Sequence, residues 1–289
     1  MAYAPEAALP EGGEVKERYD LAFGIGPACS CSQTLRGAGL QFLSLPFDWI
    51  GPNIRCRAYD EDVVRRVEHI CNGFDGWFRK DDFHSRGANS GDHLTNGMLD
   101  FYNERLELQF IHDFPRTQSF DESFPVILEK YKRRIARFLE LLDRSRKVLV
   151  LRIERPDLSF VTPLESFRIA RERLMSRYPE TQFDFVHLVQ AGGVPPEKPE
   201  ITRPEEWFTS IAFDYQSKKP GEEAFPDLGL TARSLASLAT VRDYRTREEI
   251  RKHKEALLRK KLAKAGCDTL LQLRWKKLKD SIRKRLGYL

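Results

Sequence analysis

The sequence predicts an α/β fold, in which a mostly parallel sheet is flanked by helices and is followed by a basic helical extension. Two observations lead to this prediction. Short apolar segments, typical of buried strands, alternate with helical segments of about 15 residues, and such alternation is typical of a parallel sheet with helices on both faces. Beyond about residue 234 the pattern is helical throughout, and Lys and Arg become frequent.

The strands are recognised by short apolar runs between turn residues. The segment "RYDLAFGI" (18–25) ends at Gly24-Ile25-Gly26-Pro27, which marks a strand and the turn after it. The most strand-like segment is "KVLVLRIE" (147–154), because branched aliphatic residues fill it. Further strands or extended segments are expected at 40–50, 106–111, 182–190 and 206–215.

The helices are recognised by apolar residues that recur on one face. In residues 61–71 the spacing of Val63, Val67 and Ile70 predicts such a face. Helices are likewise expected at 28–37, 122–143 and 163–178. The polar segment 79–103, rich in Gly, Asn and Asp, is expected to be a long surface loop.

The chain therefore divides into three expected parts. Residues 1–17 form an N-terminal segment rich in Pro, Glu and Ala that is expected to be disordered. Residues 18–233 form the α/β domain, and residues 234–289 form the basic helical extension.

Composition excludes several classes of protein. With 41% hydrophobic and 31% charged residues, the chain is typical of a soluble globular protein. No apolar run reaches the roughly 18 residues that cross a bilayer, and no basic segment followed by an apolar one marks a secretory signal. The five cysteines include no C-x-x-C pair, so neither a disulfide framework nor a metal site is expected. We expect a cytoplasmic location and no cofactor.

The net charge of +5 is unevenly distributed. Residues 241–289 hold 17 Lys and Arg against 6 Asp and Glu, a net charge of +11, which leaves −6 for residues 1–240. The basic helices can pack on the body, lie on an anionic membrane surface or bind a polyanion. A location at the membrane periphery therefore stays open.

Cys29 is the candidate nucleophile. The expected strand, turn and helix place it near a helix N-terminus, where unpaired backbone N–H groups lower a thiol pKa and can stabilise an oxyanion. Gly24 and Gly26 would let the backbone approach a substrate closely. The alternative is that Cys29 and Cys31 are both small buried residues.

His112 is the candidate base. It ends an expected strand and is followed by an acid, and sites in such sheets gather at strand ends. His187 lies within a strand and is interpreted as a core histidine with a satisfied hydrogen bond. The other histidines are interpreted as surface residues.

These motifs resemble a bacterial family described as putative papain-like cysteine peptidases. The resemblance covers about residues 20–190 and rests on Gly26-x-x-Cys29, Pro46-Phe47-Asp48-Trp49, His112-Asp113-Phe114 and "KYKRRIARFLELL" (130–142). It implies Cys29 and His112 as the catalytic pair, with Asp48 as first choice to orient the imidazole and Asp113 as the alternative. Asp48 can instead simply cap or brace a turn beside Trp49. The resemblance also implies a papain-like α+β fold as the alternative to the α/β prediction.

The resemblance implies acyl transfer or hydrolysis at an amide, thioester or ester, by a thiolate and imidazole that act together. The substrate, a peptide or an acyl group, is left open. Arg133, Arg134 and Arg137 could bind an anionic group, although a solvated helix face is the alternative. A non-catalytic or glycan-pathway protein that binds an anionic ligand, and an interaction protein that acts through its basic tail, remain alternative functions.

Overall fold

The computed structural model describes residues 16–26, 29–52, 61–85, 97–154, 161–216 and 226–267, together with Thr269 and Gln272. The chain divides into two compact units, Met1–Arg242 and Asp243–Leu289. The expected boundary at residue 234 falls inside a helix of the first unit, and residues 1–15 of the expected N-terminal segment lie outside the described ranges. Glu17, which was expected to belong to that segment, begins the first strand.

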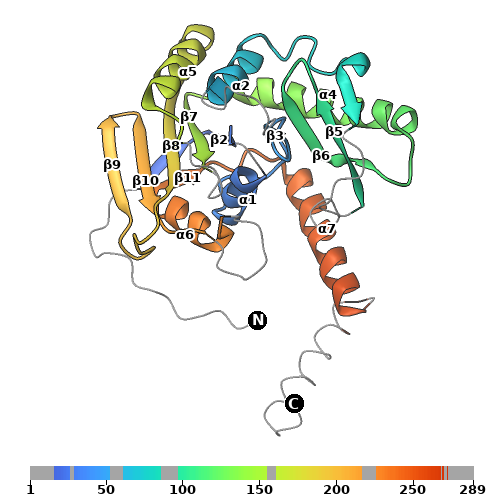
Figure 1. Cartoon of the computed structure of the whole chain (residues 1–289). Coiled ribbons are helices and arrows are strands. Elements are labelled where there is room, and N and C mark those ends of the chain that lie inside the picture. The colour runs from blue at the N-terminus through green and yellow to red at the C-terminus, as the bar shows by residue number, and fades with distance from the viewer. Residues whose placement is uncertain are drawn as a thin grey trace, which may run out of the picture. The chain divides into compact units, whose positions relative to one another are not determined.

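The centre of the first unit is a five-stranded sheet with the order β2-β7-β8-β10-β9 (Figure 1). Its strands are β2 (Leu21–Gly24), β7 (Lys147–Ile153), β8 (Gln182–Gln190), β9 (Glu200–Glu205) and β10 (Phe208–Phe213). The first four in the sheet order are parallel, and β9 pairs with β10 in the antiparallel direction. The α/β fold is thus confirmed, with a mixed rather than purely parallel sheet.

Helices cover both faces of this sheet (Figure 1). One face carries α1 (Ser30–Gly37) and α6 (Leu228–Leu238), which bury Leu35 and Leu235 on Leu149 and Leu151 of β7. The other face carries α2 (Asp62–Cys71), α4 (Phe120–Arg144) and α5 (Leu164–Arg177). There the rings of Phe23 and Phe138 lie 4.9 Å apart, and those of Phe167 and Phe185 lie 5.7 Å apart. Because strand side chains alternate between faces, each strand contributes to both layers.

A second sheet is antiparallel and has the order β3-β6-β5-β4. Its strands are β3 (Gly51–Pro52), β4 (Phe83–Ser85), β5 (Met98–Asn103) and β6 (Leu108–Pro115). Aromatic rings join it to α4, with Phe110 and Tyr131 at 5.8 Å. The prediction of one surface loop over 79–103 was therefore wrong at both ends, because Phe83 and Phe101 bury their rings despite polar neighbours in the sequence.

The expected strand at 40–50 is instead a loop with turns, and β3 contains just Gly51 and Pro52. The reason is the buried Asp48. Its carboxylate accepts hydrogen bonds from Gln41 and from the backbone N–H of Leu45 in the same loop, and these bonds require a turn rather than an extended strand. Trp49 adopts a positive φ of 86°, which strand geometry does not allow. An apolar and aromatic composition was thus mistaken for a strand signal.

The first unit ends with a small parallel pair, β1 (Glu17–Tyr19) and β11 (Ala239–Val241). The second unit contains α7 (Arg247–Ala265), which begins at a Thr246 capping box with Glu249 and ends at Gly266 with a φ of 61°. Within the described ranges, no helix is both long and apolar enough to cross a membrane. Beyond Cys267, the expected helical extension lies outside those ranges except for Thr269 and Gln272, and contact of the tail with a membrane or a polyanion stays a prediction.

Candidate functional site

The two cysteines of the strand-turn-helix segment have opposite environments. Cys29 is the N-cap residue of α1 and is half-buried. The helix follows β2 at the carboxyl ends of the parallel strands, the edge where sites of such sheets form. Backbone N–H groups in the first turn of a helix have no intrahelical partner, so Cys29 lies where a thiolate is stabilised.

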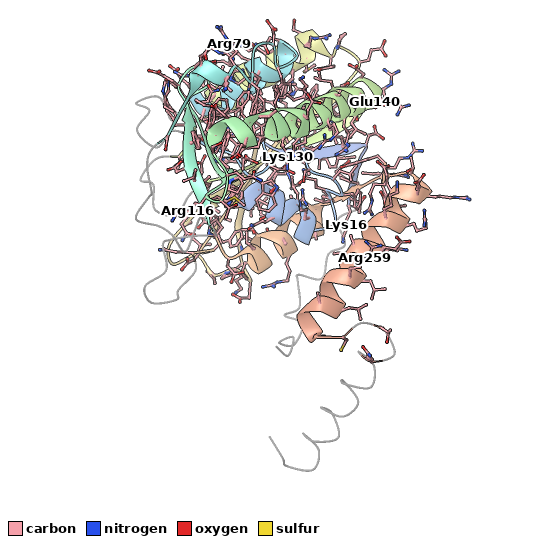
Figure 2. The ribbon with its side chains drawn as sticks, turned by 90° about the vertical axis from the view of Figure 1, so that its right-hand side faces the viewer. Lys16, Arg79, Arg116, Lys130, Glu140 and Arg259 are labelled. Atoms are coloured by element: carbon pink, nitrogen blue, oxygen red, sulfur yellow. The ribbon has the colours of Figure 1, made fainter. Side chains whose placement is uncertain are left out.

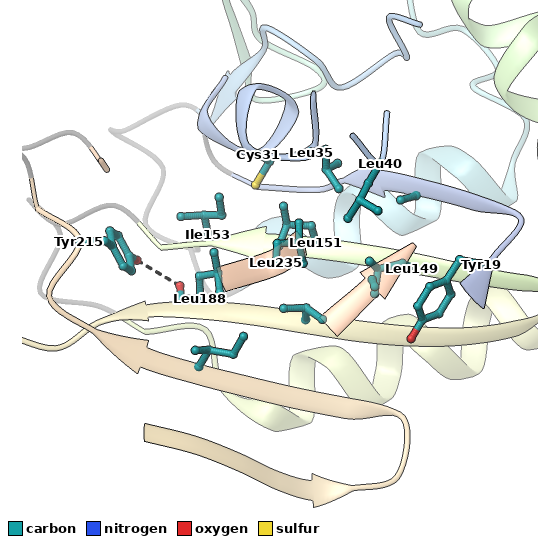
Figure 3. Close-up of a cluster of buried hydrophobic side chains, with 14 of the residues drawn as sticks. Tyr19, Cys31, Leu35, Leu40, Leu149, Leu151, Ile153, Leu188, Tyr215 and Leu235 are labelled. Carbon is teal, nitrogen blue, oxygen red and sulfur yellow. Dashed lines mark hydrogen bonds between the residues drawn. The ribbon is translucent and has the colours of Figure 1, made fainter. Parts of the chain in front are cut away.

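Cys31 is sealed between α1 and the sheet, with 2% of its surface exposed. Figure 3 shows its sulfur pointing toward the end of β7 near Ile153. Burial raises the pKa of Cys31 to about 12. A Cβ on Gly24 would lie 2.6 Å from the Cys31 Cβ, and a Cβ on Gly26 would overlap the Cys31 sulfur. The absence of a Cβ at these two glycines therefore makes room for Cys31. This contact explains both glycines without the substrate contact expected from the sequence.

His112 lies in a bulge of β6. Leu99 of β5 pairs with Phe114 and Phe101 pairs with Phe110, so residues 111–113 stand opposite the single residue Asp100. Such a bulge redirects side chains, and bulges are frequent beside active sites.

The His112 ring meets the Trp49 ring edge to face at 5.8 Å. Burial lowers the pKa of His112; the Asp113 charge opposes this and the Lys130 charge adds to it. The imidazole is therefore neutral near pH 7 and able to accept a proton.

Asp48 and Asp113 are buried, and each is bound by other groups. Asp48 accepts hydrogen bonds at 3.0 Å from Arg36, Gln41 and the backbone N–H of Leu45. Burial raises the pKa of the Asp48 carboxyl against the effect of these donors. Asp48 thus braces the loop that ends at Trp49, which is the alternative to orienting the imidazole.

Asp113 forms an ion pair with Lys130 and accepts a hydrogen bond from the Tyr131 hydroxyl at 2.8 Å. In the described part of the chain neither Asp48 nor Asp113 is hydrogen-bonded to His112. Of the two acids, Asp113 is the one whose charge acts on the His112 pKa.

The three arginines in the basic run of α4 differ in burial. Arg133 is exposed, whereas Arg134 and Arg137 are half-buried and three residues apart, on neighbouring positions of one face. Arg137 donates to the Ser44 carbonyl oxygen at 3.4 Å, and Arg134 lies over the Tyr131 ring at 5.1 Å. Lys130, labelled on α4 in Figure 2, lies four residues before Arg134, one helical turn away.

The loop 40–50 closes this group. Arg36 donates to the Ser44 hydroxyl at 3.0 Å and lies 5.7 Å from the Trp49 ring centre. We call this set the α4 cluster: Arg36, Trp49, His112, Lys130, Arg134 and Arg137. The structure thus brings together Asp48, His112, Asp113, Arg134 and Arg137 from the predicted site residues.

Cys29 lies at the opposite end of α1 from Arg36, and Arg133 is exposed on α4. Arg36 belongs to the last turn of α1 and Cys29 to its N-cap, a separation of about 10 Å along the helix axis at 1.5 Å per residue. The contribution of Arg36 and Trp49 was not predicted, since nothing in local sequence signals that a loop returns to the end of its own preceding helix.

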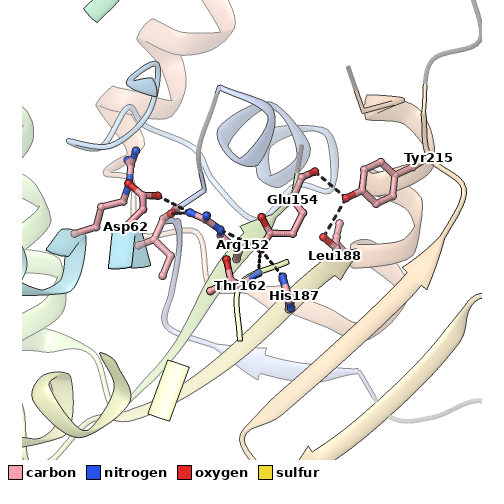
Figure 4. A network of polar contacts seen from close by, with 9 residues as sticks. Asp62, Arg152, Glu154, Thr162, His187, Leu188 and Tyr215 are labelled. Atoms are coloured by element: carbon pink, nitrogen blue, oxygen red, sulfur yellow. Dashed lines mark hydrogen bonds and ion pairs between the residues drawn. The ribbon is translucent and has the colours of Figure 1, made fainter. Parts of the chain in front are cut away.

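A second polar group, missed from the sequence, lies at the carboxyl ends of β7 and β8 (Figure 4). We call it the buried network: Asp62, Arg66, Arg152, Glu154 and His187. Arg152 donates to Asp62 at 2.6 Å and to the Ile25 carbonyl oxygen at 3.1 Å, and none of its surface is exposed. The signal for this network was the arginine within an otherwise apolar strand, "KVLVLRIE".

Glu154 links this network to β8. It lies 2.8 Å from His187 Nε2 and accepts from the Thr162 backbone N–H at 3.1 Å. Burial acts to raise the Glu154 pKa, but the Arg152 charge and these hydrogen bonds outweigh it and lower the pKa to about 2. His187 is 3% exposed, so its interpretation as a satisfied core histidine is confirmed.

No set of side chains in the described ranges is arranged to bind a metal ion. No group of three or more His, Cys, Asp or Glu side chains converges there.

The family model for "Putative papain-like cysteine peptidase (DUF1796)" matches residues 20–168. The chain belongs to this family. The match includes Cys29, Asp48, His112, Asp113 and the α4 arginines, and it ends before His187. It supports a peptidase-like hydrolase.

A relative in Acanthamoeba polyphaga mimivirus, "Uncharacterized protein R408", is 29% identical over 148 residues. The alignment covers 46% of this chain and 61% of that protein, so it spans less than two thirds of the relative's length. No solved structure matches the chain.

Proposed function

We propose that the protein is a cysteine-dependent hydrolase or acyltransferase with Cys29 as its nucleophile. The observation that carries this proposal is the contrast between the two neighbouring thiols. Cys29 is half-buried at the N-terminus of a helix, whereas Cys31 is sealed and its pKa is raised to about 12. The thiolate is the reactive form, so Cys29 is the thiol of this pair that can react.

His112 is the proposed base. Its neutral imidazole takes the Cys29 proton, and the thiolate sulfur then attacks the carbonyl carbon of an amide, thioester or ester. A carbon–sulfur bond forms, the bond to the leaving group breaks, and the imidazolium returns its proton to the leaving group. Water, or another acceptor, then cleaves the acyl-enzyme and restores the thiol.

His187 is the competing candidate for this role, because Glu154 holds its ring as an acid holds a catalytic imidazole. His112 is preferred since it is half-buried and in contact with Trp49, whereas His187 is 3% exposed. The proposed step requires His112 and Cys29 to come within hydrogen-bond reach of each other. His112 contacts Trp49, which lies beside Arg36 in the last turn of α1, whereas Cys29 is the N-cap of the same helix.

Labelling by a thiol-directed acylating probe tests the proposal. The probe is expected to modify wild type and Cys31→Ala at one site, and to leave Cys29→Ala unmodified over the same time. Cys71→Ala is the matched control, because Cys71 is also half-buried but burial raises its pKa. Peptide mapping by mass spectrometry identifies the modified residue.

The base is tested with the same probe. His112→Gln is expected to slow labelling of Cys29 by about tenfold to a hundredfold, within the usual range for loss of a general base. Because burial lowers the His112 pKa, the labelling rate of wild type should stay high below pH 6.5, the ordinary histidine value. Unchanged labelling in Cys29→Ala would show that Cys29 is not the nucleophile. A labelling rate that falls in His187→Gln but not in His112→Gln would show that His187, and not His112, is the base.

A further inference from the structure

We propose that the α4 cluster binds a phosphoryl group, held by Arg134 and Arg137 beside the Trp49 indole. The site needs no catalytic role for Cys29, so it stands or falls independently of the acyl-transfer proposal. Three features carry it: the closure of the cluster, its unpaired charge and the conformation of Trp49.

The cluster closes on itself through successive contacts. Lys130, Arg134 and Arg137 follow one another along one face of α4. Arg137 and Arg36 both donate to Ser44, one to its carbonyl oxygen and the other to its hydroxyl. Arg36 then meets Trp49, Trp49 meets His112, and the Lys130 charge acts on His112.

Tyr131 connects several of these groups, because Lys130 and Arg134 both lie over its ring, at 5.4 and 5.1 Å. Its hydroxyl donates to Asp113, and the charges of Asp113 and Asp48 both act to raise its pKa, after burial itself. Five of the residues predicted from the sequence, Asp48, His112, Asp113, Arg134 and Arg137, thus belong to one local site.

The charges of the cluster do not balance. Asp48 is paired with Arg36, and Asp113 is paired with Lys130. Among the residues that the structure describes, Arg134 and Arg137 form no ion pair with a carboxylate, and Arg134 Nη1 is buried without a hydrogen-bond partner. A buried donor without a partner costs roughly 1–3 kcal/mol, and more when it is charged. A bound anion would remove this cost.

Two adjacent guanidinium groups favour a phosphoryl group over a carboxylate. A phosphomonoester carries about −1.5 to −2 charges near pH 7 and offers three strong acceptor oxygens. It can therefore take N–H donors from both arginines at once, with the bidentate geometry that guanidinium groups provide. A single carboxylate would leave one of the two positive charges uncompensated.

Trp49 supplies a surface for the group attached to the phosphate. Its φ of 86° is unfavourable for a bulky residue and costs on the order of 1–3 kcal/mol. The hydrogen bonds to Asp48 hold the loop in this conformation, and the indole stays half-buried between Arg36 and His112. A strained conformation of this kind is useful if it presents the indole ring to a ligand.

The alternative is that the basic run is a solvated helix face. Arg133 fits that description, because it is exposed and its charge acts on the exposed Glu129. Arg134 and Arg137 do not, because each is half-buried and contacts the residues described above. Arg133 is therefore a matched control on the same helix.

Isothermal titration of the full chain with inorganic phosphate and with phenyl phosphate tests the proposal. Arg134→Gln and Arg137→Gln are each expected to weaken phosphate binding by about tenfold, the loss of roughly one charge-assisted contact. Arg133→Gln should bind as wild type does. Trp49→Leu should weaken phenyl phosphate more than inorganic phosphate, because the phenyl ring loses its contact surface.

Three results would overturn the site. They are wild-type affinity in both Arg134→Gln and Arg137→Gln, an equal loss in Arg133→Gln, or acetate binding as tightly as phosphate. Circular dichroism and the urea midpoint check folding. If a Gln variant does not fold, Arg134→Lys and Arg137→Lys decide, since they keep the charge but lose the forked donors and should still bind several-fold more weakly. Loss of labelling in Cys29→Ala leaves this result untouched.

Discussion

The buried network and the α4 cluster contain similar residue types but differ in how their charges are paired. In the buried network each arginine has a carboxylate partner, with Arg66 and Arg152 both bound to Asp62. In the α4 cluster, within the described ranges, Arg134 and Arg137 have none. The first region is almost fully enclosed, and the second is half-buried.

This difference separates a structural role from a binding role. Charges that are enclosed must be paired inside the protein, because their desolvation is otherwise too costly. Charged side chains that remain partly exposed to solvent stay hydrated, so they can lack a carboxylate partner and be available to bind an anionic ligand. Helix α1 joins the two regions, since Cys31 near its start seals the sheet beside the buried network and Arg36 at its end belongs to the α4 cluster.

The largest expected effect is that of Arg152→Met. The change leaves Asp62 and Glu154 enclosed without their shared partner, and breaking a buried pair typically costs about 3–5 kcal/mol. Urea denaturation measures the loss in free energy of unfolding. Arg168→Met is the control, because its pair with Glu205 is largely exposed and should contribute less than about 1 kcal/mol. If the two substitutions lowered the free energy of unfolding equally, buried ion pairs would not stabilise this protein more than exposed ones.

The next effect concerns pH. The Glu154 pKa is about 2 in the folded protein, against 4.5 for a free glutamate. A lowered carboxyl pKa stabilises the fold above pH 4.5, and this stabilisation disappears as pH falls toward 2. Glu154→Gln should therefore cost on the order of 3 kcal/mol at pH 7, from the size of the shift.

The gap between wild type and Glu154→Gln should narrow below pH 4.5, as measured by urea midpoints from pH 7 to 3. Glu180→Gln provides the control, since Glu180 is exposed. A gap that is constant over this range would show that the Glu154 charge does not stabilise the network.

The smallest effect is that of Gly26→Ala, which tests the junction between the two regions. The added Cβ overlaps the Cys31 sulfur, and overpacking of this kind costs about 1–3 kcal/mol. Adding Cys31→Ala should restore part of the loss, a coupling that a double-mutant cycle measures. Gly192→Ala, where nothing lies within 4 Å of the new Cβ, should be nearly neutral. Absence of coupling would mean that Gly26 has another role.

Much of the fold could be predicted because its strands and helices have strong local patterns. The strand expected at 182–190 matches β8 at both ends, and the helix expected at 61–71 differs from α2 by one residue. The errors fell where burial depended on distant partners. Phe83 and Phe101 lie in a polar sequence and are buried by α4 and β6, which arrive from elsewhere in the chain.

The candidate site shows the same division. Sequence motifs indicated Cys29, His112 and the arginines of α4. They could not indicate that Arg133 faces solvent while Arg134 is half-buried, because residues next to each other on a helix differ by about 100° in direction. They left Asp48 open between orienting the imidazole and bracing a turn beside Trp49, and the hydrogen bonds to Gln41 and Leu45 show that it braces its own loop.

The sequence by itself determined the order of strands and helices, the uneven distribution of charge and the residue types available for chemistry, since all three follow from local composition and periodicity. The tertiary structure alone decided which charges are paired, which of two thiols is sealed and which cations are left without a carboxylate. Burial and pairing are properties of segments far apart in the chain that pack together, and their free energies depend on that packing rather than on any local pattern.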